Sequence, residues 1–468
     1  MVSILDKYED LLNKIETIKF NGKVKKAVGL TIEGTGPQGN LGELCHIIIP
    51  DQTTGKERRL DAEVVGFNED GIILMSYGDF SGISQGSPIV GTGRPLEIPV
   101  GRSLLGRILN GKGEPIDGKG SVSPDKYYSI FRQNIKALSK KRIRKKISVG
   151  IKAIDGLLTT GEGQRVGIFS GSGIGKSTVL GMISRFTEAD VNVIALIGER
   201  GREVNDFLEK DLGEEGLKKS VVVIATSDEA PIMRLRGAFV ATTIAEYFRD
   251  KGLRVMFLMD SITRFARAQR EIGLAVGEPP STRGFTPSVF TILPVLLERT
   301  GTSDKGSITA FYTVLVEADD MNEPVADNVR AILDGHVVLS REMASMNHYP
   351  AVDVLESISR LMIDVVDDQH MKDAGKVREI LATYKEAYDL INIGAYARGS
   401  NPRIDYAIEM IDKVNTFLKQ GIFEKIGYEK TEELLHALFT DNEKLKQVDK
   451  KREVAGNAKV PISAPKIA

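Results

Sequence analysis

The chain has almost none of the residues that build disulfide frameworks or zinc sites. Its 468 residues include a single cysteine, Cys45, which excludes both a disulfide framework and a multi-cysteine zinc site. The histidines are scattered along the sequence without the spacing of a metal site. We therefore interpret all five as structural residues; they are His46, His336, His348, His370 and His436.

The sequence also lacks an excess of charge of one sign and a long hydrophobic run. The 63 lysines and arginines nearly balance the 64 aspartates and glutamates, which argues against a strongly basic nucleic-acid-binding protein. No apolar run approaches the roughly 18 residues that a membrane span needs. Acidic residues at positions 6, 9 and 10 stand where a signal peptide requires basic and apolar ones. The sequence therefore predicts a cytoplasmic protein, and its length predicts about three domains.

The first 100 residues show two patterns. Residues 1–22 carry apolar side chains at helical spacing and predict an amphipathic helix, which either packs on its own domain or docks a partner. From 23 to 100, short β-rich runs alternate with glycine, proline, asparagine and aspartate. This alternation predicts a small β-barrel domain. We expect its strands near 24–32, 44–49, 62–67, 71–75 and 88–90.

Residues 101–150 form a connector with turn signals and a basic run at its end. Seven of the eleven residues from 136 to 146 are lysine or arginine. Two interpretations stay open for this run: a solvated linker whose charges repel one another, or a contact for acidic partners or anionic lipid. The basic residues are Lys136, Lys140, Lys141, Arg142, Arg144, Lys145 and Lys146.

The rest of the chain changes from mixed to helical. Residues 151–365 alternate near-continuous apolar runs with helical segments, which predicts an α/β domain with a parallel sheet. We expect strands at 165–170, 193–197, 220–225, 255–259 and 307–316. Residues 366–440 have a helical pattern, and the polar, lysine-rich residues 441–468 are predicted to be a mobile tail.

The strongest functional signal is a glycine-rich loop after the predicted strand 165–170. A strand, such a loop and then a helix form the context of a phosphate-binding loop, in which backbone N–H groups and the helix N-terminus cradle phosphates. Lys176 would reach the β- and γ-phosphates, and Ser177 would ligate magnesium. Ser170 replaces the first glycine of the strict pattern, a change that we treat as tolerated. The predicted nucleotide-binding residues are Gly171, Ser172, Gly173, Ile174, Gly175, Lys176, Ser177 and Thr178.

Two acidic residues follow other predicted strands. Asp260 ends the apolar run 254–259, and a carboxylate at the tip of a buried strand suits a magnesium-supporting role. Glu199 follows the strand 193–197, and ligands of doubly wound sheets lie at the carboxyl ends of strands. A carboxylate there can hold the attacking water, although a charged loop with internal ion pairs is the alternative.

Three motifs together resemble the catalytic subunits of rotary ATPases: the phosphate loop, Gly198–Glu203 and Leu258–Arg264. The resemblance covers roughly residues 20–440, and within that group the chain is most similar to the ATPases of flagellar type III protein export. The stretches that carry this finer match are Glu278–Gly284, Gly306–Thr313, Ala331–His336 and Asn392–Gly399.

The resemblance implies a fold and a set of roles. It implies a RecA-like P-loop ATPase core at 151–365, an N-terminal β-barrel, a C-terminal helical domain, and ATP with Mg²⁺ as ligands. It assigns water activation to Glu199, a contact near the γ-phosphate to Arg200, and a water-mediated magnesium contact to Glu203. Tyr349 matches the aromatic residue that stacks on adenine. Arg360 matches the arginine finger that a neighbouring subunit supplies.

The resemblance also implies partners. It predicts a homohexamer with a central stalk protein, an export gate at the inner face of the cytoplasmic membrane, export substrates with their chaperones, and a regulator that binds the N-terminal helix. The predicted function is Mg-ATP hydrolysis that energises flagellar export through chaperone release and stalk rotation.

Four alternatives to the flagellar ATPase stay open. An injectisome ATPase is the nearest, although the sequence of Glu278–Gly284 and of the barrel favours the flagellar branch. An ATP-synthase catalytic subunit is disfavoured, because the acidic Asp-Glu-Leu-Ser-Glu-Glu-Asp segment of such subunits is missing near 389–402. The others are an RNA translocase on a similar core and a non-catalytic ring subunit, which usually lacks the water-activating glutamate that is present here as Glu199.

Overall fold

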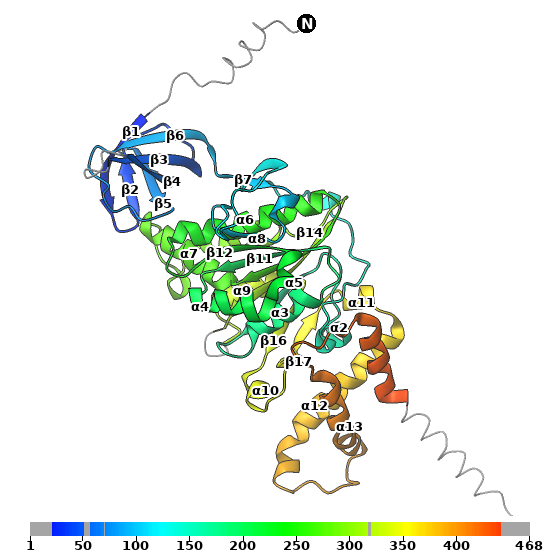
Figure 1. Ribbon diagram of the computed structural model, residues 1–468. Helices are drawn as coiled ribbons and strands as arrows, with labels where there is room; N and C mark the ends of the chain where they lie inside the picture. The colour runs from blue at the N-terminus through cyan, green and yellow to red at the C-terminus, as the bar shows by residue number, and fades with distance from the viewer. Residues whose placement is uncertain (1–20, 51–56, 70, 317–319, 441–468) are drawn as a thin grey trace, which may run out of the picture. The chain divides into compact units, whose positions relative to one another are not determined.

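The computed structural model describes residues 21–50, 57–69, 71–316 and 320–440 (Figure 1). The predicted helix at 1–22 and the predicted tail at 441–468 lie outside the described residues, apart from positions 21 and 22. The chain folds into two compact units, each built from several stretches of sequence. Of the described residues, the first unit comprises those within 21–142, 162–172 and 189–334, and the second comprises those within 143–161, 173–188 and 335–440.

The first unit begins with a closed six-stranded β-barrel, as the sequence predicts (blue in Figure 1). Its strands are β1 (Asn21–Val28), β2 (Thr31–Gly34), β3 (Glu43–Pro50), β4 (Glu57–Asn68), β5 (Gly71–Ser76) and β6 (Pro88–Pro95), in the order β1-β2-β5-β4-β3-β6. Alternate residues of β3 point inward, so that Cys45 and Ile47 are fully buried with Ile32 of β2 and Leu74 of β5.

The first strand differs from the prediction. The run 24–32 was expected to be one strand, but Gly29 adopts a φ of 60° and the chain turns there into an antiparallel pair, β1 and β2. A glycine reaches this conformation without steric cost, which an alternating apolar pattern does not reveal.

A parallel α/β sheet forms the core of the first unit. In the order β10-β15-β13-β11-β12-β8, its strands run parallel, and every residue of β11 and β12 is buried. Their bounds are β8 (Ile108–Asn110), β10 (Arg165–Ser170), β11 (Val191–Ile197), β12 (Ser220–Ala225), β13 (Arg254–Asp260) and β15 (Ser307–Leu315). A separate two-stranded sheet is formed by β7 (Glu97–Val100) and β9 (Lys126–Ser129). The short strand β14 (Gly301–Thr302) pairs with β15.

Helices pack on this sheet. Helix α6 contacts β11, β12 and β13, and α7 contacts α6 and β15. The helices of the first unit are α4 (Gly201–Asp206), α5 (Gly213–Lys218), α6 (Pro231–Asp250), α7 (Ile262–Ala275), α8 (Pro287–Leu297) and α9 (Pro324–Ile332). The strands predicted at 165–170, 193–197, 220–225, 255–259 and 307–316 are all present within one residue or two of their expected ends.

The barrel and the sheet domain of the first unit are joined by a buried ionic network. The guanidinium of Arg236 on α6 donates a 3.0 Å hydrogen bond from Nε to Oε2 of Glu63 on β4. The hydroxyl of Tyr77 donates a 2.6 Å hydrogen bond to the same carboxylate, and the Arg236 guanidinium lies 4.6 Å from the ring centre of Phe131. The Glu63 side chain is only 1% exposed. Burial and the neighbouring Glu63 carboxylate raise the pKa of Tyr77 well above its ordinary value.

The second unit is mostly helical. Its strands β16 (Gly335–Leu339) and β17 (Val352–Ser359) pair antiparallel, and α12 packs against α13, α2 and β17. Its helices are α2 (Lys152–Leu157), α3 (Lys176–Phe186), α10 (Arg341–Ser345), α11 (Met362–Val365), α12 (Asp368–Asn392), α13 (Pro402–Leu418) and a last helix over 428–440. The region from 366 to 440 is helical, as predicted.

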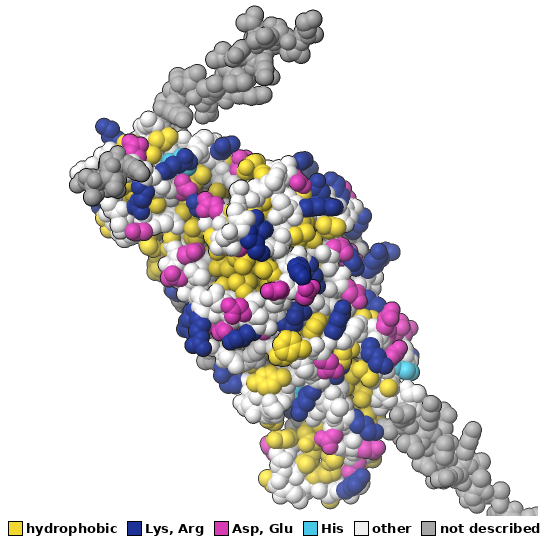
Figure 2. Space-filling view, viewed as in Figure 1, with side chains coloured by type: hydrophobic (Ala, Val, Ile, Leu, Met, Phe, Trp, Pro, Cys, Tyr) yellow, Lys and Arg dark blue, Asp and Glu magenta, His cyan; other side chains and the backbone are white. Residues whose placement is uncertain are grey.

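The charges on the surface are mixed. Lysines and arginines are interspersed with aspartates and glutamates on the face in Figure 2, in keeping with the near-zero net charge.

The basic run 136–146 contacts other parts of the protein. Lys140 Nζ lies 2.6 Å from Glu298 Oε2, and Lys146 Nζ lies 3.5 Å from the ring centre of Tyr428. Among the described helices, none is long and apolar enough to cross a membrane.

Candidate active site

The phosphate loop connects β10 to α3. Ser170 ends the buried strand, and α3 begins at Lys176 with Gly175 as its N-cap. Gly173 and Gly175 have φ values of 79° and 95°, a left-handed conformation that side chains with a Cβ rarely adopt. The first turn of α3 holds Lys176, Ser177 and Thr178, all half-buried. The N–H groups at a helix N-terminus and the positive end of the helix dipole favour a bound anion, so the start of α3 suits a phosphate group.

Tyr349 lies beside this loop within the second unit. A Cβ added to Gly175 would be 3.8 Å from Cε1 of Tyr349, whose side chain is 43% exposed. The carbonyl of Tyr349 accepts a 3.0 Å hydrogen bond from the backbone N–H of Gln420. A half-exposed aromatic ring next to the phosphate loop is therefore available to stack on a flat base, as the resemblance implies for this residue.

A second exposed aromatic residue, Phe423, was not predicted from the sequence. It is 71% exposed and lies three residues beyond Gln420. Arg185 of α3 donates a 2.6 Å hydrogen bond to the carbonyl of Ile422, and its guanidinium lies 5.1 Å from the ring centre of Phe423. The sequence shows only an isoleucine and a phenylalanine side by side after α13, a pattern that does not distinguish a ligand contact from a surface residue.

The first unit places the two predicted acidic residues at the ends of neighbouring strands. Strands β11 and β13 are adjacent and parallel, with Leu196 paired to Asp260, and Glu199 follows β11 by two residues. Asp260 is 4% exposed and Glu199 is 6% exposed. Oδ1 of Asp260 accepts a 2.7 Å hydrogen bond from Oγ1 of Thr313 on β15. Two buried carboxylates thus lie at the carboxyl edge of the parallel sheet, where ligands bind in such folds.

Arg200 and Glu203 are more exposed than Glu199. Nη1 of Arg200 lies 3.0 Å from Oε1 of Glu203, and their side chains are 74% and 49% exposed. This is an internal ion pair of the kind that was the alternative interpretation of the loop, but it joins Arg200 to Glu203 and does not include Glu199. Both side chains are at the surface, so a ligand can replace either partner of the ion pair at little cost in free energy.

Arg360 follows the last residue of β17 and is exposed. The end of that strand is fixed by Ser359, whose hydroxyl donates a 2.9 Å hydrogen bond to the carbonyl of Thr159. An exposed arginine on a fixed strand end has the accessibility that a residue acting on a neighbouring subunit requires.

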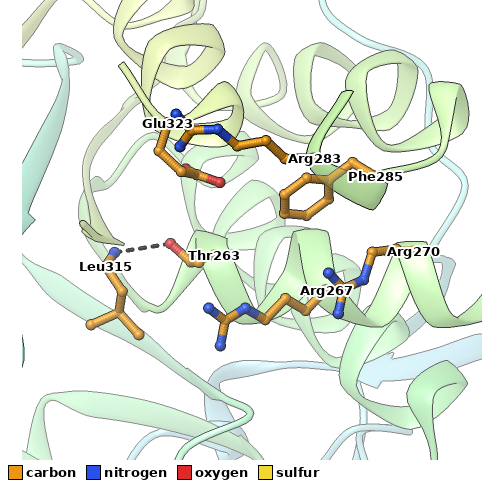
Figure 3. A pocket seen from close by; sticks show the side chains of 7 residues that line it. All are labelled: Thr263, Arg267, Arg270, Arg283, Phe285, Leu315 and Glu323. Atoms are coloured by element: carbon orange, nitrogen blue, oxygen red, sulfur yellow. Dashed lines mark hydrogen bonds between the residues drawn. The ribbon is translucent and has the colours of Figure 1, made fainter. Parts of the chain in front are cut away.

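A basic pocket of about 400 Å³ adjoins the segments that hold Asp260 (Figure 3). The guanidinium groups of three arginines border it, together with Thr263, Phe285, Leu315 and Glu323. The hydroxyl of Thr263 accepts a 2.9 Å hydrogen bond from the N–H of Leu315. These arginines are Arg267, Arg270 and Arg283; Arg283 lies in the stretch Glu278–Gly284 that carries the family resemblance, whereas no motif in the sequence marks Arg267 and Arg270. Such a lining can hold a carboxylate or a phosphate group.

The donor set fits magnesium better than a transition metal. Mg²⁺ prefers hard oxygen ligands and usually binds through one or two protein groups plus substrate phosphates. The hydroxyl of Ser177 and the buried carboxylate of Asp260 are such groups. Within the described residues, no cluster of three or more histidines, cysteines or acids could hold a metal by itself. His370 makes a structural contact instead, with its Nε2 atom 2.7 Å from the carbonyl oxygen of Gly156.

Comparison with known proteins identifies the class. The ATP synthase alpha/beta family matches twice, through its nucleotide-binding domain at residues 150–359 and its beta-barrel domain at 24–93. Residues 366–437 match the T3SS EscN ATPase C-terminal domain. The chain belongs to the ATP synthase alpha/beta family, and its fold is the one predicted: a P-loop ATPase core with an N-terminal β-barrel and a C-terminal helical region.

Relatives over nearly the whole chain narrow the class. The chain is 54% identical to the flagellum-specific ATP synthase of Bacillus subtilis over 93% of its own length and 98% of the relative. It is 51% identical to the type 3 secretion system ATPase of Xanthomonas euvesicatoria over 90% and 94%. The assembled ATPase EscN of enteropathogenic E. coli superposes with a TM-score of 0.84 at 44% identity, covering 89% of this chain and 99% of EscN. The chain is therefore an ATPase of the type III export group.

Proposed function

We propose that the protein hydrolyses Mg-ATP to energise type III export of flagellar proteins. The observation that carries the proposal is the pair of buried carboxylates, Glu199 and Asp260, at the carboxyl ends of adjacent parallel strands in a chain that has a phosphate-loop sequence. A non-catalytic ring subunit has no need of a buried glutamate at this position. Several of the most similar relatives are flagellar, which favours flagellar over virulence export.

In this proposal each residue has a chemical task. The loop N–H groups and Lys176 bind the phosphates, while Tyr349 and Phe423 hold the adenine. Glu199 orients the attacking water and accepts its proton, and Arg200 contacts the γ-phosphate side. Ser177 and Asp260 would hold magnesium, with Glu203 contacting it through water, and the ion would supply positive charge against the phosphates.

The proposed working unit is a homohexamer in which Arg360 of one subunit stabilises transition-state charge in the next. The solved relative EscN has been seen assembled and in complex with its central stalk EscO, which supports a ring and a stalk partner here. We further propose that a regulator binds residues 1–22, that the ring acts at an export gate on the inner face of the cytoplasmic membrane, and that it releases export substrates from chaperones. No nucleic-acid partner is expected.

Phosphate release by the purified full-length chain tests the enzymatic part. Lys176→Ala and Glu199→Gln should each lower turnover by at least a hundredfold with an unchanged circular dichroism spectrum. Matched controls are Lys210→Ala and Glu215→Gln, whose side chains are 71% and 88% exposed. Equal activity of the site variants and the controls would contradict the site. Stimulation by RNA would favour the translocase instead.

The export system needs a separate experiment. A pulldown of the tagged chain from its own cells should recover flagellar export components. Recovery of injectisome sorting components without flagellar ones would assign the protein to virulence secretion.

A further inference from the structure

The second unit contains a cavity of about 410 Å³ that the proposed reaction does not use. Four segments line it and leave it open to solvent on one side: residues 340–348 around α10, the start of β17, the middle of α12 and the end of α13. Its size is within the range of small-molecule sites, which bury most of a ligand between apolar walls with a few polar anchors.

The walls of this cavity are apolar and adaptable. They include Met343 and Met346, whose flexible thioether side chains fit ligands of varied shape. Tyr384 and Tyr388 of α12 lie edge to face, 6.1 Å between ring centres, so that they present aromatic surface. The remaining apolar lining residues are Val352, Val354, Leu355, Leu381, Ile411 and Leu418.

The charges around the cavity balance. Glu342 and Asp353 oppose Lys385 and Lys419. The Asp353 carboxylate already accepts a 2.9 Å hydrogen bond from the N–H of Leu355. The lining therefore has no net charge that would select an ion, and it favours a neutral ligand.

Two polar side chains can anchor such a ligand. His348 lines the cavity and is 7% exposed, and its Nε2 atom is buried without a hydrogen-bond partner among the described residues. Burial, with the nearby charge of Lys419, lowers the pKa of His348 to about 4, so its ring is neutral near pH 7. The side-chain torsion of a histidine ring is soft, so the ring can turn Nε2 toward a ligand. A hydroxyl group suits either tautomer, because it both donates and accepts, and Asn415 adds an amide.

We propose that this cavity binds a neutral, hydroxylated aromatic small molecule, with His348 and Asn415 as its polar anchors. The site is joined to the predicted adenine position through the chain itself. Tyr349 follows His348, and its carbonyl accepts the hydrogen bond from Gln420, which follows the lining residue Lys419. A ligand that fits the cavity stabilises this arrangement of Tyr349 and should therefore strengthen nucleotide binding. This coupling rests on the proposed role of Tyr349, but the binding itself does not.

The binding test uses 2-naphthol and, as a matched probe without the hydroxyl, 2-methylnaphthalene. On the full-length chain, fluorescence titration should show one saturable 2-naphthol site, about fivefold tighter than that of 2-methylnaphthalene. Leu381→Trp fills the cavity and should abolish binding, whereas Leu390→Trp, at a 49% exposed position of the same helix, should not. His348→Phe should reduce the preference for 2-naphthol over 2-methylnaphthalene, since only Asn415 then remains as a polar anchor. Binding that survives Leu381→Trp, or no saturable binding to wild type, would overturn the site.

The coupling is read with a fluorescent ATP analogue. Saturating 2-naphthol should raise the affinity for this analogue about two- to fivefold in wild type and leave it unchanged in Leu381→Trp. No change in wild type would overturn the coupling. If the analogue fails to bind at all, the proposed function fails, while the naphthol titration still decides the cavity.

Discussion

The hydroxyl of Thr313 donates a 2.7 Å hydrogen bond to the carboxylate of Asp260, and both side chains are buried on adjacent parallel strands. This bond aligns the carboxylate that we assign to magnesium. Thr313→Val keeps the shape but removes the donor, so kcat should fall about tenfold while the stability loss stays near 1–2 kcal/mol. Steady-state kinetics and urea unfolding measure the two effects. Thr309→Val, on the same strand, removes a buried hydroxyl that accepts from Gly163 and should reduce stability without lowering kcat; an equal kcat loss in both would contradict the assignment.

Arg360 should act in trans. Arg360→Ala is expected to remove turnover and spare nucleotide binding, because the arginine stabilises charge that develops only in the transition state. Phosphate release and titration with a fluorescent ATP analogue measure both quantities, and Arg94→Ala, at a side chain 70% exposed in the barrel, is the control. Mixing Arg360→Ala with Lys176→Ala chains should restore part of the activity, since some ring sites then combine one intact residue from each. Normal turnover of the Arg360→Ala chain would refute the role.

The ion pair between Arg236 and Glu63 should be important for stability. Arg236→Met leaves the Glu63 carboxylate buried without its counterion, which should lower the free energy of unfolding by about 3–5 kcal/mol. The exposed pair of Arg94 and Glu97, tested by Arg94→Met, should cost less than about 1 kcal/mol. Urea denaturation of the full-length chains compares them. Similar small losses in both would mean that the Arg236 pair is hydrated in solution.

Asp155 should make stability depend on pH. It accepts hydrogen bonds from Ser148 and from two backbone N–H groups, but burial raises its pKa to about 6 from an ordinary value of 3.8. The folded state therefore binds a proton more tightly than the unfolded state, so stability from this group is present below pH 4 and is lost as pH rises to about 6. Relative to Asp155→Asn, wild type should lose up to about 3 kcal/mol over this range. Parallel pH slopes of the two unfolding curves would contradict the shift.

The sequence was sufficient to predict those structural elements that depend on neighbouring residues. The sequence predicted a strand, a glycine-rich loop and a helix around 165–186, and the structure has β10 and α3 there, because glycine conformations and helix starts depend on neighbouring residues. Near-continuous apolar runs located the buried parallel strands for the same reason. The prediction was wrong at Gly29, where the structure has two strands in place of the one expected. The pattern of apolar residues does not show that a single residue adopts a positive φ.

Contacts between distant segments could not be predicted from spacing. Nothing near position 313 marks its threonine as the partner of Asp260, and nothing near position 423 marks Phe423 as a neighbour of Arg185. The roles of Tyr349 and Arg360 came from family resemblance alone and remain predictions, although the structure shows Tyr349 beside Gly175 and Arg360 exposed at a strand end.

The sequence by itself therefore determined the class of fold, the order strand, glycine-rich loop and helix around 165–186, and the absence of a disulfide or cysteine-metal framework. These follow from composition and from short-range patterns. Only the tertiary structure decided which hydroxyl supports Asp260, which carboxylate faces Arg236, how part of the basic run contacts the protein, and that a neutral cavity lies next to Tyr349. Each of these depends on segments brought together by the packing of apolar faces, which leaves many pairings open until the whole core is formed.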